Sequence, residues 1–314
     1  MGLSKRDSKL LFELDLDSRQ SNLSLARKLR ISKNTVASKL ERFQREGLIR
    51  DFYTVIDVGK LGYRGIRVYI KLRRCPPKKR EEVVKYLVHS PITWWVGNIE
   101  KEFDIGFVVW IKELWEFEPV WRKFEKKFHS YMARICLCLY TGVYEGTYGF
   151  LEPEKKRNVY YIGMHSKVDV TENELRVLKL ISNDAQARTV SMASRLGLSP
   201  LTVQHCIRRL KNKGIIKGFR IRLDVSSLGY TFYKIDFQIS NMEIRERMLA
   251  YVLSLPNVIF VDESIGFADL ELGAVFKTHG EFREFLDEFM KHFSKSVADS
   301  SYFIYLKVHK IKHF

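Results

Sequence analysis

The chain has 314 residues, of which 46% are hydrophobic and 29% charged, and its formal net charge is +17. A chain of this length can form about two to four domains with real cores, so we exclude wholesale disorder. It holds no apolar run long enough for a membrane span and no signal peptide at its N-terminus, so we expect a cytoplasmic protein with no membrane partner. The basic excess indicates that the protein binds an anionic partner, of which nucleic acid is the first candidate. The alternative is a soluble protein that happens to be basic.

Chemistry-bearing residues are sparse. The four cysteines (Cys75, Cys136, Cys138 and Cys206) are scattered, and no Cys-His set has zinc-like spacing, so we expect packed thiols and no metal. No Ser-His-Asp, Cys-His or paired-carboxylate arrangement stands out. We therefore expect no enzyme activity and no cofactor.

The N-terminal segment predicts three short helices. Ser4 precedes an apolar pattern that is typical of a capped amphipathic helix. A second helix is expected at about 23–29, and Arg30-Ile31 forms a turn. Ser32 then caps a third helix, which runs to Glu46 and ends at Gly47. Three helices with such a tight turn indicate a helix-turn-helix.

In a helix-turn-helix, the third helix lies in the major groove with its first residues at the base edges. Its outward side chains suit this task, because Asn can pair with adenine, Lys can donate to guanine and Thr can touch a thymine methyl. We predict double-stranded DNA as the partner, although a solvated polar helix face is the alternative. The predicted DNA-binding residues of this helix are Lys33, Asn34, Thr35, Ser38, Lys39 and Arg42.

The segment is repeated. Residues 24–63 and 191–230 align without a gap at an offset of 167, with 15 identical pairs among 40. Ordinary composition would give roughly 2 to 3 identities by chance. Two helix-turn-helix units on one chain suggest a covalent version of a symmetric DNA-binding dimer.

The second recognition helix has a weaker polar face. It begins at Ser199-Pro200, but Leu201 and Cys206 stand where the first copy has Asn34 and Lys39, and neither can make a bidentate base contact. The useful residues that remain are Thr202, Gln204, His205, Arg208 and Arg209. Residues 1–166 also carry 32 basic and 20 acidic side chains (+12), against 22 and 17 (+5) for residues 167–314. Because Leu201 and Cys206 cannot make such contacts, the first copy is predicted to do most of the specific reading.

Strand and helix patterns follow each helix-turn-helix. After a strand at 48–55, the first copy predicts strands at 64–72, 92–99, 103–111 and 133–140, with helices at about 78–89 and 116–131. The second copy predicts strands at 231–239, 257–264, 268–276 and 299–308, with helices at 243–255 and 279–294. The segment between the copies is aromatic for a linker, so we expect it to pack on a sheet or at an interface.

The repeated run Leu25-Ala26, Ser32, Thr35-Val36, Gly47-Leu48-Ile49 and Leu61-Gly62-Tyr63 resembles the Lrp/AsnC family (leucine-responsive, or feast/famine, regulators). The resemblance implies an α+β fold in which each winged helix-turn-helix precedes a ferredoxin-like βαββαβ sensor domain. The expected division is helix-turn-helix 1 at 1–60, sensor 1 at 61–144, linker at 145–168, helix-turn-helix 2 at 169–227 and sensor 2 at 228–314.

The resemblance also implies a function. It predicts a transcriptional regulator whose two sensors pair within one chain as a pseudo-dimer, with a further homodimer left open. Family members bind an amino-acid effector near a Gly-x-x-Asp turn, which the second copy keeps at Gly266 and Asp269 and the first copy lacks at Lys101. A strand-end hydrogen bond is the alternative role for the aspartate.

Two other functions stay open. Siroheme decarboxylases resemble the same two-domain unit, so a tetrapyrrole enzyme is the second reading, although residues 94–103 lack the His and Arg that their pattern implies. An architectural protein that coats DNA through phosphate contacts is the third.

Overall fold

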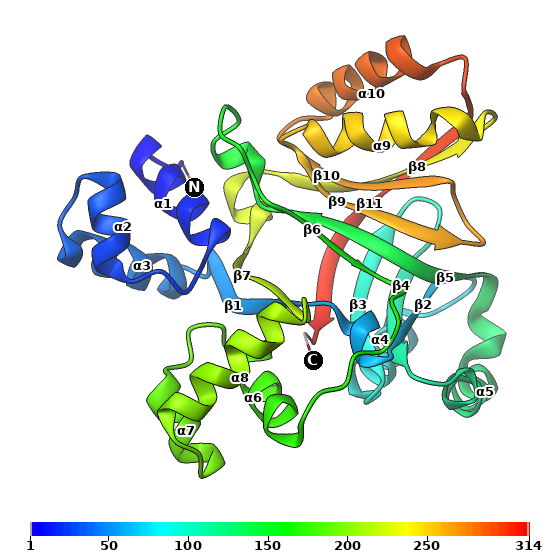
Figure 1. Ribbon diagram of the computed structural model, residues 1–314. Coiled ribbons are helices and arrows are strands. Elements are labelled where there is room, and N and C mark those ends of the chain that lie inside the picture. The colour runs from blue at the N-terminus through cyan, green and yellow to red at the C-terminus, as the bar shows by residue number, and fades with distance from the viewer. Residues whose placement is uncertain (1, 313) are drawn as a thin grey trace.

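The computed structural model describes residues 2–312 and 314, and it contains two three-helix units on the same side of the molecule (Figure 1). The first unit consists of α1 (Lys5–Leu16), α2 (Asn22–Leu29) and α3 (Lys33–Arg45). The second consists of α6 (Glu172–Ser182), α7 (Thr189–Leu196) and α8 (Pro200–Asn212). Both expected helix-turn-helix regions are therefore confirmed.

Local chemistry explains where the helices begin. The hydroxyls of Ser4, Ser32, Thr171 and Ser199 each accept a hydrogen bond from a backbone N–H in the first turn of the helix that follows. Such caps satisfy amides that no helical carbonyl can reach. The apolar stripes of the helices then pack into one core that both units share.

The strands after the two units pair with each other. β1 (Ile49–Ile56) and β7 (Ile216–Leu223) form a two-stranded antiparallel sheet. Ile49 lies opposite Leu223, and Ile56 lies opposite Ile216. Since position 49 corresponds to 216 and position 56 to 223, each contact is matched by its symmetric counterpart. This is the pattern of a two-fold interface, here within one chain.

Each copy continues into a four-stranded sheet with two helices. The first has β2 (Arg64–Leu72), α4 (Pro77–His89), β3 (Thr93–Glu100), β4 (Ile105–Ile111), α5 (Phe117–Phe128) and β5 (Met132–Gly146). The second has β8 (Thr231–Ile239), α9 (Arg245–Ser254), β9 (Val258–Ile265), β10 (Leu270–Phe276), α10 (His279–Phe293) and β11 (Val297–Ile311). The βαββαβ order expected for both sensors is confirmed.

The two sheets join into a closed ring. The strands follow the order β2-β4-β3-β11-β8-β10-β9-β5, and β5 pairs back with β2. The edge strand of each sheet thus crosses to the other copy, β5 to β9 and β11 to β3. Tyr140 lies opposite Ser264, and Tyr305 lies opposite Ile99, which are equivalent pairs at an offset of 165. The ring has the same pseudo-two-fold symmetry as the β1–β7 sheet.

Hydrophobic side chains sort by face along these strands. One core fills the space between the first sheet and α4 with α5, and a second fills the space between the other sheet and α9 with α10. The opposite faces of both sheets point into the ring, where Tyr69, Phe103 and Phe303 form a small aromatic cluster. Each sheet is therefore covered on both faces.

The segment between the copies is structured. β6 (Val159–Gly163) pairs with β5, and Tyr148 and Leu151 join the core of the helix-turn-helix units. In addition, Ser8 donates a hydrogen bond of 2.6 Å to the carbonyl of Leu151. This segment fixes the first helix-turn-helix to the ring.

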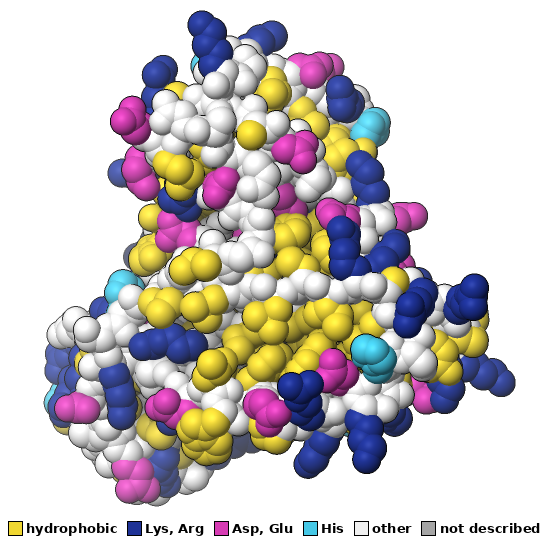
Figure 2. All heavy atoms as spheres, turned by 90° about the vertical axis from the view of Figure 1, so that its right-hand side faces the viewer, with side chains coloured by type: hydrophobic (Ala, Val, Ile, Leu, Met, Phe, Trp, Pro, Cys, Tyr) yellow, Lys and Arg dark blue, Asp and Glu magenta, His cyan; other side chains and the backbone are white. Residues whose placement is uncertain are grey.

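The surface away from the helix-turn-helix units is apolar at its centre and charged at its margin (Figure 2). β5 lies on this side, and its Ile135 and Leu137 are exposed. Within the described part of the chain, no helix has both the length and the apolar character needed to cross a bilayer.

The helix-turn-helix turns contain a difference in backbone strain. Arg30 ends α2 in the left-handed conformation (φ 53°), where the second copy has Gly197 (φ 65°). A side chain in this conformation costs about 1 kcal/mol relative to glycine. We predict that Arg30→Gly raises the free energy of unfolding by about 1 kcal/mol and that Gly197→Ala lowers it by a similar amount. Urea unfolding measures both, and a loss of stability in Arg30→Gly would contradict the prediction.

Candidate functional site

The first recognition helix presents a free polar surface at its N-terminal end. Lys33, Asn34, Thr35 and Ser38 are all exposed. The Thr35 hydroxyl lies 2.9 Å from the Ser32 hydroxyl, so it belongs to the helix cap. The ordered start of α3 therefore fixes the position from which Lys33, Asn34 and Ser38 project.

The side chains of Lys39 and Arg42 were expected to point outward, but both are paired with a carboxylate of α1. The Nζ of Lys39 is 2.6 Å from Oδ1 of Asp7, and Nη2 of Arg42 is 3.2 Å from Oδ2 of the same carboxylate. Asp7 is buried and also caps α1 through Ser4. Both side chains are therefore held by a carboxylate of α1, and Lys39 is half-buried.

The second unit repeats this carboxylate. Glu174 corresponds to Asp7 at the offset of 167 and caps α6 through Thr171. Its oxygens lie 3.0 Å from Nε of Arg209 and 2.7 Å from Nζ of Lys213. Burial would raise the pKa of Glu174, but the hydrogen bonds from Lys213 and Thr171 and the charges of Lys213 and Arg209 together lower it. Arg42 and Arg209 occupy equivalent positions, and both are predicted to contact DNA. Each is also paired with the carboxylate of its own copy, Asp7 or Glu174.

The second recognition helix offers a different set of polar groups. Gln204, His205, Arg208 and Arg209 are exposed, whereas Thr202 is half-buried and its hydroxyl lies 2.8 Å from the Ser199 hydroxyl. Leu201 is 60% exposed at the helix start, where the first copy has Asn34. The difference between the two reading surfaces is therefore present in the fold as well as in the sequence.

The residues of the predicted effector turn have structural roles. Gly266 adopts φ 103°, and the corresponding Lys101 adopts φ 107° despite its side chain. The carboxylate of Asp269 accepts a hydrogen bond of 2.7 Å from the amide of Ile239. Asp104 accepts one of 2.8 Å from the amide of Leu72. Both aspartates make the strand-end hydrogen bond of the alternative interpretation, and effector binding stays a prediction.

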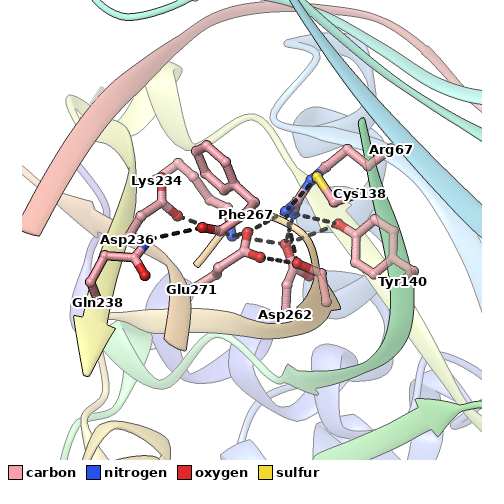
Figure 3. Close-up of polar contacts among 10 residues, drawn as sticks. Arg67, Cys138, Tyr140, Lys234, Asp236, Gln238, Asp262, Phe267 and Glu271 are labelled. Atoms are coloured by element: carbon pink, nitrogen blue, oxygen red, sulfur yellow. Dashed lines mark hydrogen bonds and ion pairs between the residues drawn. The ribbon is translucent and has the colours of Figure 1, made fainter. Parts of the chain in front are cut away.

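The ring encloses a buried cluster of charges that links the two copies (Figure 3). Arg67 on β2 pairs with Asp262 on β9 at 3.0 Å and with Glu271 on β10. Lys234 on β8 lies 2.9 Å from each of these carboxylates. The Tyr140 hydroxyl donates a further hydrogen bond of 2.9 Å to Asp262. Burial would raise the pKa of Glu271, but Arg67 and Lys234 lower it.

The cluster is unequal between the copies. Lys234 is the counterpart of Arg67, but Asp262 and Glu271 correspond to Gly97 and Gly106. A Cβ on Gly97 would lie 2.6 Å from the Trp95 ring, and one on Gly106 would lie 2.9 Å from the Tyr69 ring. Aromatic rings thus occupy in the first copy the space that carboxylates use in the second.

A second buried ion pair shows the same division. Nε and Nη2 of Arg220 on β7 lie 2.9 and 2.8 Å from the carboxylate of Asp15 on α1. Nη1 of Arg220 also lies 2.6 Å from Glu145. Arg220 corresponds to Tyr53, and Asp15 corresponds to Ser182. Each copy therefore holds only one member of the pair, and two identical copies could not form it. The charges match only when the first copy meets the second.

Asp236 is the exception in the cluster. It is 3% exposed, and neither of its carboxylate oxygens has a hydrogen-bond partner among the described residues. Burial raises its pKa to about 8, although Lys234, 3.8 Å away, opposes the shift. At neutral pH the protonated Asp236 leaves two cations facing two carboxylates.

Comparison with known proteins agrees with this architecture. A family model described as winged helix-turn-helix DNA-binding matches residues 3–50 and 170–217. An uncharacterised HTH-type transcriptional regulator of Pyrococcus abyssi is 32% identical over 116 residues, which are 37% of this chain and 72% of that protein. One of Pyrococcus furiosus is 25% identical over 125 residues, which are 39% and 81%. The crystal structure of the siroheme decarboxylase NirDL covers 99% of this chain and 94% of its own, with a TM-score of 0.67 and 16% identity.

The matched residues and the ring define a tandem winged helix-turn-helix protein. The chain belongs to the Lrp/AsnC-type helix-turn-helix family, with two copies in one polypeptide. The likeness to NirDL shows that a tandem arrangement of this fold occurs in a solved structure.

Sequence reasoning missed the buried charges, although a signal was available. In the strand at 64–72, Ile66, Val68 and Ile70 alternate with Arg67 and Tyr69. Alternation alone places Arg67 on a solvent face. Lys234 stands at the same place in the second copy, so a cation at this position indicates a role that both copies share. In the structure, both cations pair with Asp262 and Glu271.

We predict that Asp236 makes stability depend on pH. Its folded pKa of about 8 exceeds the ordinary value of 3.8, so between these values the folded chain keeps a proton that the unfolded chain has lost. The free energy of unfolding therefore falls as pH rises through this window, by up to about 1.4 kcal/mol per pH unit.

Asp236→Asn removes this pH dependence. The free energy of unfolding of the variant, relative to that of the parent chain, should therefore increase between pH 5 and pH 8. Urea unfolding at several pH values measures it, with the exposed Asp299→Asn as the control. Parallel pH profiles for the parent and Asp236→Asn would contradict the prediction.

Proposed function

We propose that the chain is a DNA-binding transcriptional regulator without catalytic activity, in which one polypeptide supplies both reading heads. The exposed Lys33, Asn34 and Ser38 at the capped start of α3 carry this proposal. Their side chains can hydrogen-bond base edges in the major groove. The relatives named as HTH-type transcriptional regulators support the same function.

The pseudo-two-fold pairing supports a single chain as the binding unit. Strands of the two copies pair in both sheets, so the two recognition helices are held by the same body. Helix-turn-helix dimers read two half-sites whose spacing mirrors the separation of their helices. Here the two half-sites would differ in sequence, because Asn34 corresponds to Leu201. An amino-acid effector near Gly266 and Asp269 remains part of the proposal.

The first copy is proposed to carry most of the specificity. After selection of a bound duplex from a random pool, we predict that Lys33→Ala with Asn34→Ala weakens binding to that duplex by about tenfold or more. Gln204→Ala with Arg208→Ala should cost less. Titration at fixed salt measures both, and equal losses would contradict the asymmetry.

Two controls sharpen this experiment. Lys39→Met should change stability more than sequence preference, because Lys39 is paired with Asp7. A random duplex at the same salt separates specific reading from phosphate-dominated binding. Equal affinity for the selected and random duplexes would favour the architectural alternative.

A siroheme-decarboxylase-like enzyme is the second candidate, because the likeness to NirDL extends over nearly the whole chain. That likeness is one of fold. We predict that the purified chain shows no tetrapyrrole absorbance band and gains none on titration with iron-uroporphyrin III. A saturable band with one tetrapyrrole per chain would instead support the enzyme.

A further inference from the structure

The first sensor has an open cavity between α4 and α5, on the outer side of its sheet. Its volume is about 430 Å³, and its apolar wall includes Tyr86, Pro91 and Val120. A narrow extension shares Tyr86 and Val120 and leads toward Phe107 in the core. Cavities of this size are typical of small-molecule sites. We call it the α4–α5 groove.

Cations line the rim of the α4–α5 groove. Lys85, Lys123 and Lys127 contribute to the lining, and among the described residues none of them lies within ion-pair distance of a carboxylate. Glu82 also lines the groove, but Lys79 lies 2.9 Å from it and neutralises its charge. The groove thus presents unpaired positive charge beside an apolar wall.

A buried polar group lies at the end of the groove. Ser90 is 9% exposed and lines both the cavity and its extension. Its hydroxyl has no hydrogen-bond partner among the residues described, while its carbonyl accepts a bond of 2.8 Å from Lys310. An unpaired buried hydroxyl is costly, and a polar ligand atom in the groove could satisfy it.

The second sensor keeps Tyr86 and Pro91 as Tyr251 and Pro256, but other residues of the groove have changed. At the offset of 165, Ser90 corresponds to Leu255, Val120 to Phe285, Lys123 to Glu288 and Lys85 to Ala250. The ring of Phe285 packs on Phe276, with their centroids 5.2 Å apart. A larger side chain and a carboxylate therefore replace the small wall residue and the cation. The groove is a property of the first copy and not of the fold.

We propose that the α4–α5 groove binds a small organic anion with an apolar body. The lysines hold its carboxylate or phosphate group, the Ser90 hydroxyl makes a hydrogen bond to it, and the apolar body lies on Tyr86 and Val120. The proposed site is separate from both recognition helices and from the Gly266–Asp269 turn.

The test uses 8-anilinonaphthalene-1-sulfonate, a fluorescent anion with an apolar body, on the full chain. We expect one probe to bind per chain. Val120→Phe, which copies the second sensor, should abolish this binding. Lys123→Glu should weaken it about tenfold, whereas Lys126→Glu, an exposed residue on the same helix, makes the same charge change and should leave it nearly unaltered.

Two further measurements test the proposal. The uncharged analogue N-phenyl-1-naphthylamine should bind about tenfold more weakly than the sulfonate. Phenylacetate or phenyl phosphate should displace the probe, and which of them does so identifies the anionic group. Unchanged binding in Val120→Phe, equal losses in Lys123→Glu and Lys126→Glu, or displacement by neither anion would overturn the proposal, provided urea unfolding shows that the variants fold.

Discussion

The pairing of the two copies along one pseudo-two-fold axis is the constraint on which the rest of the structure depends. Each four-stranded sheet has an edge strand whose backbone groups need a partner, and β5 and β11 find it in the opposite copy. Inside the ring, Arg67 reaches the two carboxylates of the second copy. Removing one member of such a buried set costs roughly 3–5 kcal/mol, because the remaining charge is left unpaired.

Charge also explains why the copies are not interchangeable. Two first copies would bring two Arg67 side chains together without the carboxylates that Asp262 and Glu271 supply. With Asp236 protonated, two second copies would bring two carboxylates, Asp262 and Glu271, for each lysine. Only the mixed pair is balanced, and Asp15 with Arg220 repeats this division near the helix-turn-helix units. Complementary charges of this kind select one pairing by penalising the others.

The outer surfaces of the two copies also differ. The first copy keeps the polar start of the recognition helix and the α4–α5 groove, while the second fills the corresponding places with Leu201 and Phe285. The internal carboxylates Asp7 and Glu174 are kept by both, because each joins the first helix of its unit to the recognition helix. A shared scaffold thus carries two surfaces that differ.

The repeat, the order of the helices and strands and the family could be predicted from the residues alone, because they follow from local periodicity, capping residues and turn glycines. The exposure of Lys33, Asn34 and Ser38 could be predicted in the same way, because it depends on one helix. The three-dimensional packing was needed to show that Lys39 is paired with Asp7 and that Arg67 is buried among the acids of the second copy. Helical or strand period gives the direction of a side chain, but what lies there depends on segments distant in the chain.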